Sequence, residues 1–164
     1  VVGCKLIYPN NKIQHIGVQI NEHFEPYHPY AGFLDRNSHG YFGRNNFNSN
    51  YIAVTGACMM VQRKIFLQTE GFDQINLKIA YNDVDFCLKV NALGKRNIVL
   101  PEIILIHHES YSRGNDLLSP QKKQRLIKEH AFLKRKWFNT GKLKRDPYVS
   151  PRLIYSQTGI KCKN

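Results

Sequence analysis

The sequence predicts an α/β fold with a mixed sheet and flanking helices, and three observations lead to this prediction. Two β-rich runs, residues 1–8 and 13–20, are separated by Pro, Asn and Lys in a turn-like segment. Apolar residues recur at helical spacing over residues 82–93, where Gly then follows. Two short β-branched runs lie on either side of Pro101. Strands and helices that alternate along one chain are typical of the α/β class.

The first half of the chain adds a long loop, a buried strand and a short helix. Residues 21–50 have no periodicity and are rich in aromatic residues, Asn, Gly and Pro, which predicts a long loop with a function of its own. Residues 51–61 are continuously apolar and small, so we expect a buried strand in which Gly56 allows a close approach to the backbone. Residues 63–70 predict a short helix that ends at Gly71.

The second half predicts two short strands, residues 98–100 and 103–106, and then a basic helix. Ser119 followed by Pro120 is a typical helix start, and the amphipathic pattern continues to about Phe138. The pattern fades beyond this helix. We therefore expect a loop-like tail at residues 146–164.

Charge is concentrated in the C-terminal quarter of the chain. Residues 1–121 contain 11 Lys and Arg against 10 Asp and Glu, whereas residues 122–164 contain 13 against 2. A localised positive field favours anionic partners. We expect residues 122–145 to meet an anionic membrane surface. Nucleic acid is not an expected partner, because the rest of the chain is nearly neutral.

The four cysteines are far apart in the sequence and form no Cys-x-x-Cys pair. We expect free thiols in a reducing cytoplasm. No apolar run reaches the roughly 18 to 20 residues of a membrane-spanning helix, so we expect a cytoplasmic protein that attaches peripherally to the inner membrane face.

Two groups of residues are candidates for chemistry. Asn82 is a good N-cap, which would place Asp83 at the first helical position, where a carboxylate can act as a general base or simply stabilise the helix dipole. His107 and His108 follow a predicted strand, where either can be a metal ligand, although an ordinary hydrogen-bonding role is the more common one. Because neighbouring residues of an extended chain point in opposite directions, we expect only one of the two to face a given site.

Four segments together resemble the rhamnosyltransferase-like branch of family 2 glycosyltransferases. They are residues 3–18 (beginning GCKLIYP), 54–73 (VTGACMMV to GFD), 81–89 (YNDVDFCLK) and 107–114 (HHESYSRG). Their order and spacing match the family over roughly residues 1–153. The resemblance implies a GT-A fold, a nucleotide-diphospho-sugar donor, and a saccharide or lipid-linked acceptor in cell-surface polysaccharide synthesis.

The resemblance also assigns roles to individual residues. The catalytic base of the family corresponds to Asp83, with Asn82 in place of the acid that usually precedes it. Desolvation and a neighbouring carboxylate such as Asp85 would raise the pKa of Asp83, as base catalysis near neutrality requires. Gly56, Ala57, Asn82 and Asp85 would contact the substrate.

The segment after the last predicted strand carries the expected metal and phosphate contacts. By resemblance, His107 helps to hold a divalent ion, Mg or Mn, and His108 is the less favoured ligand. Ser110, Ser112 and Arg113 would close over the diphosphate, for which the guanidinium of Arg is suited.

The family's nucleotide-binding units and its Asp-X-Asp metal motif have no counterpart in the chain. We therefore expect residues 1–118 to be the acceptor-side part of the catalytic domain and residues 119–164 to be a basic helix and tail. Alone, the chain would be inactive and would lack the metal, and an exposed face could lead it to form a homodimer. The alternative is a carbohydrate-binding module without catalysis, in which the aromatic residues of segment 23–47 stack on sugars.

Overall fold

The computed structural model describes residues 1–108, 119–155, 158 and 160–162, and it has the predicted mixed α/β architecture. The main sheet has the strand order β2-β1-β7-β5, and β6 also pairs with β1. β1 and β7 are parallel, and the other pairings in this sheet are antiparallel. The strands of this sheet are β1 (Val2–Ile7), β2 (Ile13–His15), β5 (Ser49–Tyr51), β6 (Met59–Met60) and β7 (Asn97–Ile106).

The predicted N-terminal hairpin is confirmed, but its second strand is shorter than expected. β1 and β2 pair through Leu6 with His15, and the strand then stops before Gly17, which has φ +113°. A Cβ atom at Gly17 would lie 2.3 Å from the ring of Tyr51, so the chain must turn here against that ring. The continuation, β3 (Gln19–Ile20), pairs with β4 (Pro26–Tyr27) in a separate ribbon.

The expected continuous strand over residues 51–61 is wrong. β5 ends at Tyr51, the next three residues are buried without forming a ladder, and Gly56 and Ala57 form an exposed turn before β6. The run is apolar because its first residues are buried, and Val54 is part of the hydrophobic core. The turn at Gly56 contacts α2 through a hydrogen bond to Asp83.

The two short strands expected around Pro101 are one strand, β7. Its parallel register with β1 shifts between Cys4, which pairs with Leu100, and Lys5, which pairs with Ile104. Pro101 lies in this bulge, where a missing N–H breaks no ladder hydrogen bond.

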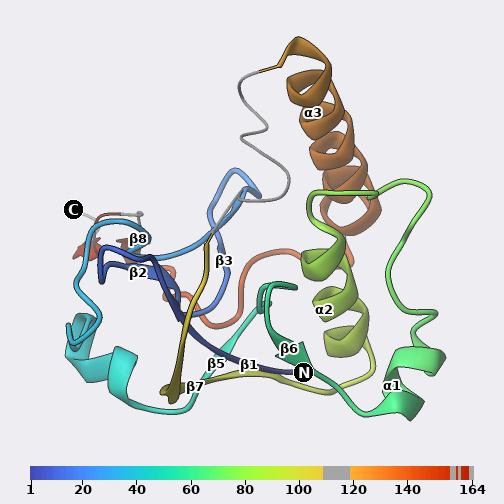
Figure 1. Ribbon diagram of the computed structural model, residues 1–164. Helices are drawn as coiled ribbons and strands as arrows, with labels where there is room; N and C mark the ends of the chain where they lie inside the picture. The colour runs from blue at the N-terminus through green and yellow to red at the C-terminus, as the bar shows by residue number, and fades with distance from the viewer. Residues whose placement is uncertain (109–118, 156–157, 159, 163–164) are drawn as a thin grey trace.

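The helices lie close to where the sequence predicts them. They are α1 (Arg63–Gln68), α2 (Asn82–Ala92) and α3 (Pro120–Lys134), which continues into a π-helical turn, η3 (Arg135–Asn139). Figure 1 shows α2 and α3 together on one side of the molecule. A 3₁₀ segment, η1 (Tyr41–Asn46), forms within the long loop. The tail contains a hairpin of β8 (Leu153–Tyr155) and β9 (Ile160–Cys162), so the expectation of a wholly loop-like tail is also wrong.

One hydrophobic core includes residues from both ends of the chain. Ile13 of β2, Val84 of α2 and Leu133 of α3 belong to the same buried cluster as Trp137 and Phe138 of η3. The basic helix is therefore fixed to the body of the protein by its apolar side. Within the described part of the chain, no helix combines the length and the apolar character needed to cross a membrane.

Candidate active site

A cavity of about 810 Å³ opens where the ends of β1 and β7 meet the N-terminus of α2. Its wall includes the turn at Gly56 and Ala57, the helix start at Asn82 and Asp83, and His107 at the end of β7. Segments that are distant in the sequence thus meet at one hollow, whose size suits a small-molecule ligand.

Asp83 is held at this cavity by two backbone amides. The N–H of Gly56 donates to Oδ2 of Asp83 at 2.8 Å, and the N–H of Val84 donates to Oδ1 at 2.8 Å. A Cβ atom at Gly56 would lie 3.4 Å from Cβ of Asp83, which is an ordinary van der Waals contact, so this approach does not by itself require glycine. The carboxylate is half-buried, which leaves it oriented and still reachable from the cavity.

The start of α2 differs from the prediction. Asn82 is the first residue of the helix, and Tyr81 occupies the N-cap position in a left-handed conformation with φ 61°. The amide of Asn82 donates to the carbonyl of Ile79 at 3.4 Å and does not cap the helix. A left-handed tyrosine costs about 1–2 kcal/mol, so the surrounding contacts must hold this turn in place. One of them is the hydrogen bond from the N–H of Ala80 to the carboxylate of Glu129 on α3, at 2.7 Å.

Asp85 lies away from the cavity. Its carboxylate is fully buried and accepts hydrogen bonds from Nε1 of Trp137 at 2.7 Å and from Nζ of Lys136 at 2.9 Å. Lys89 is 3.5 Å from the same carboxylate. Asp85 therefore ties α2 to η3. We accordingly leave it out of the substrate site, and it is not placed to act on Asp83 from within the cavity.

His107 and His108 both border the cavity, although adjacent side chains of a strand were expected to diverge. His107 is half-buried, and its Nδ1 lies 2.8 Å from Oε1 of Gln14 on β2. The Gln14 oxygen is an acceptor, so Nδ1 of His107 carries the proton and Nε2 has the lone pair that a metal ligand needs. Ser110, Ser112 and Arg113 lie outside the described residues.

The residues described here do not form a complete metal site. Among them, no three His, Cys, Asp or Glu side chains come together closely enough to hold an ion. His107 supplies one suitable nitrogen, whereas a catalytic divalent ion usually requires several protein ligands.

A second histidine pair in the wall was not predicted. Nδ1 of His15 lies 2.8 Å from Nδ1 of His28, and both rings border the cavity that contains Asp83. His15 is almost completely enclosed, and burial together with the nearby His28 lowers its pKa well below the usual value. His15 ends β2 and His28 follows β4, and no sequence spacing predicts that two such residues meet. Only the fold shows the pair.

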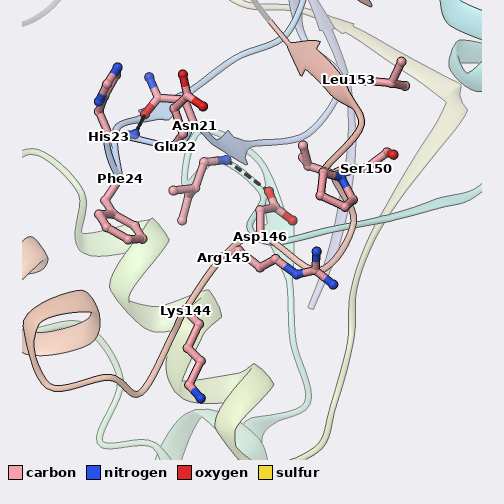
Figure 2. A pocket seen from close by; sticks show the side chains of 12 residues that line it. Asn21, Glu22, His23, Phe24, Lys144, Arg145, Asp146, Ser150 and Leu153 are labelled. Carbon is pink, nitrogen blue, oxygen red and sulfur yellow. Dashed lines mark hydrogen bonds between the residues drawn. The ribbon is translucent and has the colours of Figure 1, made fainter. Parts of the chain in front are cut away.

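A smaller hollow of about 290 Å³ lies between residues 20–24 and 144–153 (Figure 2). At its base the carboxylate of Asp146 accepts the N–H of Ile20 at 3.0 Å and the N–H of Tyr148 at 2.9 Å. Burial raises the pKa of Asp146 to about 6. Both carboxylate oxygens bind backbone amides, so we interpret Asp146 as a link between the tail and β3.

Three bacterial proteins show what the chain is similar to. It is 40% identical over 136 residues to the uncharacterized protein y4gI of Sinorhizobium fredii, and the aligned region covers 83% of this chain and 15% of that protein. It is 32% identical over 157 residues to the O-antigen biosynthesis protein RfbC of Myxococcus xanthus, which is 96% of this chain and 12% of that protein.

A shorter match is to the N-acetylglucosaminyl-diphospho-decaprenol L-rhamnosyltransferase of Mycobacterium tuberculosis, 30% identical over 63 residues, or 38% of this chain and 20% of that protein. The chain thus spans a small part of each of these relatives. No family model and no solved structure matches it. The names of the last two relatives support a glycosyltransferase-like family.

Proposed function

We propose that this chain is the acceptor-side part of an inverting, family 2-type glycosyltransferase with a GT-A fold. The observation that carries the proposal is the carboxylate of Asp83, which two backbone amides orient at the edge of a large cavity. A carboxylate so placed suits the removal of a proton from a hydroxyl group. The names of the relatives support a saccharide or lipid-linked acceptor in polysaccharide synthesis. The nucleotide-diphospho-sugar donor is what the family resemblance implies.

In the proposed reaction, Asp83 accepts the proton of an acceptor hydroxyl as the oxygen attacks the anomeric carbon of the donor. The new carbon–oxygen bond forms while the bond to the diphosphate breaks, so the configuration inverts and a nucleoside diphosphate leaves. Gly56 contributes through its N–H, which fixes one oxygen of Asp83 and leaves the remaining lone pairs for the acceptor.

The departing diphosphate requires positive charge or hydrogen-bond donors. We assign this role to Arg113, with Ser110 and Ser112, from their resemblance to the family motif. A divalent ion, Mg or Mn, would neutralise the same charge when bound, with His107 as one ligand. Because no three metal-binding side chains come together among the described residues, we derive no step through the ion.

The test is glycosyl transfer by the natural protein that carries this chain, measured over a panel of nucleotide sugars with Mn²⁺ or Mg²⁺. The Asp83→Asn variant should lose about 10²–10⁴-fold in kcat, the usual contribution of a general base. The matched control is Asp35→Asn, since Asp35 is an exposed carboxylate paired with Lys12 outside the cavity. Equal activity of the two variants would refute the role of Asp83. Failure of the unmodified protein to use any donor would refute the enzyme proposal.

A binding module without catalysis is a second candidate, favoured by exposed aromatic side chains in the long loop. Phe33, Tyr41, Phe42 and Phe47 are all exposed, and Phe42 is exposed by 87%. Exposed rings can stack on sugars. In this case glycan binding would be lost on Phe42→Ala and unchanged on Asp83→Asn, which is the opposite of the pattern expected for the enzyme.

We also propose that α3 places the protein on an anionic membrane surface, at the inner face of a cytoplasmic membrane. Lys123, Lys128 and Arg135 are exposed on α3 and η3, and Ile127 among them is exposed by 59% although it is apolar. Cations around an exposed apolar side chain suit a bilayer interface, where each Lys or Arg near the surface contributes about 1 kcal/mol.

Vesicle co-sedimentation tests this surface. The chain should bind vesicles that contain phosphatidylglycerol and not vesicles of phosphatidylcholine alone, and binding should weaken as salt increases. Lys123→Glu with Lys128→Glu should abolish binding. The pair Lys64→Glu with Lys95→Glu, exposed lysines outside α3, makes the same change in net charge and should keep most of it. Equal losses in both pairs would show that total charge, and not the α3 surface, governs binding.

A further inference from the structure

The basic helix α3 contacts the turn that begins α2, and this turn leads directly to the proposed catalytic base. Figure 1 shows the two helices on the same side of the molecule. Residues 80 and 81 form the turn, and Asp83 follows two positions later. The carbonyl of Tyr81 accepts the N–H of Asp85 at 2.9 Å, which is the first backbone hydrogen bond of α2. The position of the turn therefore fixes where α2 starts and where Asp83 is held.

Two neighbouring residues of α3 hold this turn. Oε2 of Glu129 accepts the N–H of Ala80 at 2.7 Å, and the ring of His130 lies beside the ring of Tyr81, with centroids 5.4 Å apart. The other carboxylate oxygen of Glu129, Oε1, lies 3.8 Å from Nε of Arg125. Glu129 is only 4% exposed, and a carboxylate is almost never buried unless it is paired. Its place in the fold is thus explained by these contacts.

The turn depends on contacts from outside because its own backbone is unfavourable. Tyr81 is left-handed, with φ 61°, a conformation that few residues other than glycine adopt. The N-cap position forms no side-chain hydrogen bond to the helix. Such a residue persists only where the surrounding structure over-determines it. Glu129 supplies part of that support from α3.

We propose that Glu129 is a positioning residue for Asp83, whose bond to Ala80 fixes the turn before α2 and thereby holds the carboxylate of Asp83 where an acceptor hydroxyl can reach it. The catalytic part of this inference rests on the proposed function. The structural part does not, because it follows from the contacts of the turn alone. In this arrangement α3 carries basic residues on its exposed side and completes the candidate site with its buried side.

Hydrogen exchange, followed by mass spectrometry, tests the structural part without any substrate. The N–H groups of Gly56 and Val84 donate to Asp83, so their exchange reports whether its carboxylate stays in place. In the natural protein that carries this chain, Glu129→Ala should make the peptides that contain these two amides exchange about tenfold faster, the equivalent of one lost hydrogen bond. Glu129→Gln should stay within about threefold of the original, because its amide oxygen can still accept the N–H of Ala80.

A general loss of stability would give a different pattern. It would speed the exchange of peptides from β1 and β7, which open with the whole fold, and leave the two amides at Asp83 unchanged. Gln124→Ala, an exposed substitution on the same helix, is the matched control and should change neither group. The pattern of general destabilisation, or equal exchange in Glu129→Ala and Glu129→Gln, would overturn the inference whether or not the protein is a glycosyltransferase.

Kinetics test the catalytic part, at a temperature at which circular dichroism shows both variants to be folded. Glu129→Ala should lower kcat by about 10²-fold, the effect of a catalytic group displaced by about 1 Å, with the donor KM unchanged. Glu129→Gln should keep kcat within about threefold of the original, as a retained hydrogen bond predicts. A change confined to KM, or equal losses of kcat in the two variants, would overturn the catalytic role. If the unmodified protein transfers no sugar, the proposed function fails, and the exchange pattern still decides whether Glu129 holds Asp83.

Discussion

The two acids at the start of α2 should differ sharply when each is removed. Asp85→Ala takes away the buried acceptor of Nε1 of Trp137 and the counter-charge of Lys136, which lie 2.7 Å and 2.9 Å from its oxygens. An unsatisfied buried N–H costs about 1–3 kcal/mol, and breaking a buried ion pair costs about 3–5 kcal/mol.

The lower part of that range applies here, because Lys136 and Lys89 keep part of their side chains in water. Lys89 also keeps its hydrogen bond to the carbonyl of Gly71. We therefore expect Asp85→Ala to reduce the free energy of unfolding by about 3 kcal/mol. For a chain of this length that corresponds to a fall in Tm of roughly 6–12 °C.

Asp83→Asn should reduce the free energy of unfolding by about 1 kcal/mol, because the amide oxygen can still accept the N–H of Gly56 and only the N–H of Val84 loses its acceptor. Urea titrations of both variants, with circular dichroism as the signal, measure the two values. Equal losses, or a larger loss for Asp83→Asn, would refute the division of the two acids into a base at the cavity and a link to η3.

Two further predictions concern stability. Burial raises the pKa of Asp146 to about 6 from an ordinary value of 3.8, so the protonated form contributes stability that is present in full below about pH 4 and is lost as the pH rises through 6. The free energy of unfolding should therefore fall by about 3 kcal/mol over this range. Urea titrations between pH 4 and 7 should show this fall in the original chain and not in Asp146→Asn. Gly17→Ala should destabilise the fold by more than about 3 kcal/mol, because its Cβ would overlap the ring of Tyr51, whereas Gly32→Ala, also at positive φ but with nothing within 4 Å of the added Cβ, should cost about 1 kcal/mol in the same measurement.

Helices were easier to predict than strands, and the reason is local. The end of α2 and the start of α3 depend on near neighbours in the sequence, namely Gly94 and the Ser119–Pro120 pair. β7 was expected as two strands because Pro101 cannot donate to a ladder, but the bulge that accommodates it depends on the register of β1. Whether Pro101 ends the strand therefore depends on how β7 pairs with β1, and this pairing cannot be predicted from the local sequence.

The sequence predicted part of the candidate site. Asp83, Gly56 and His107 do lie around one cavity, as the resemblance implied. His15 and His28 could not have been predicted, because only the packing of β2 against the loop after β4 brings their rings together.

The place of Asp85 could have been predicted from helical geometry. Successive residues of an α-helix are separated by 100°, so two residues apart means about 200°, on nearly opposite faces. If the carboxylate of Asp83 faces the cavity, that of Asp85 must face the other side of α2, where η3 packs. Acidity suggested that the two residues act together, whereas the period of the helix separates them. The chemical type of a helical side chain thus indicates which roles are possible, and the direction in which it points from the helix axis determines whether it can perform them.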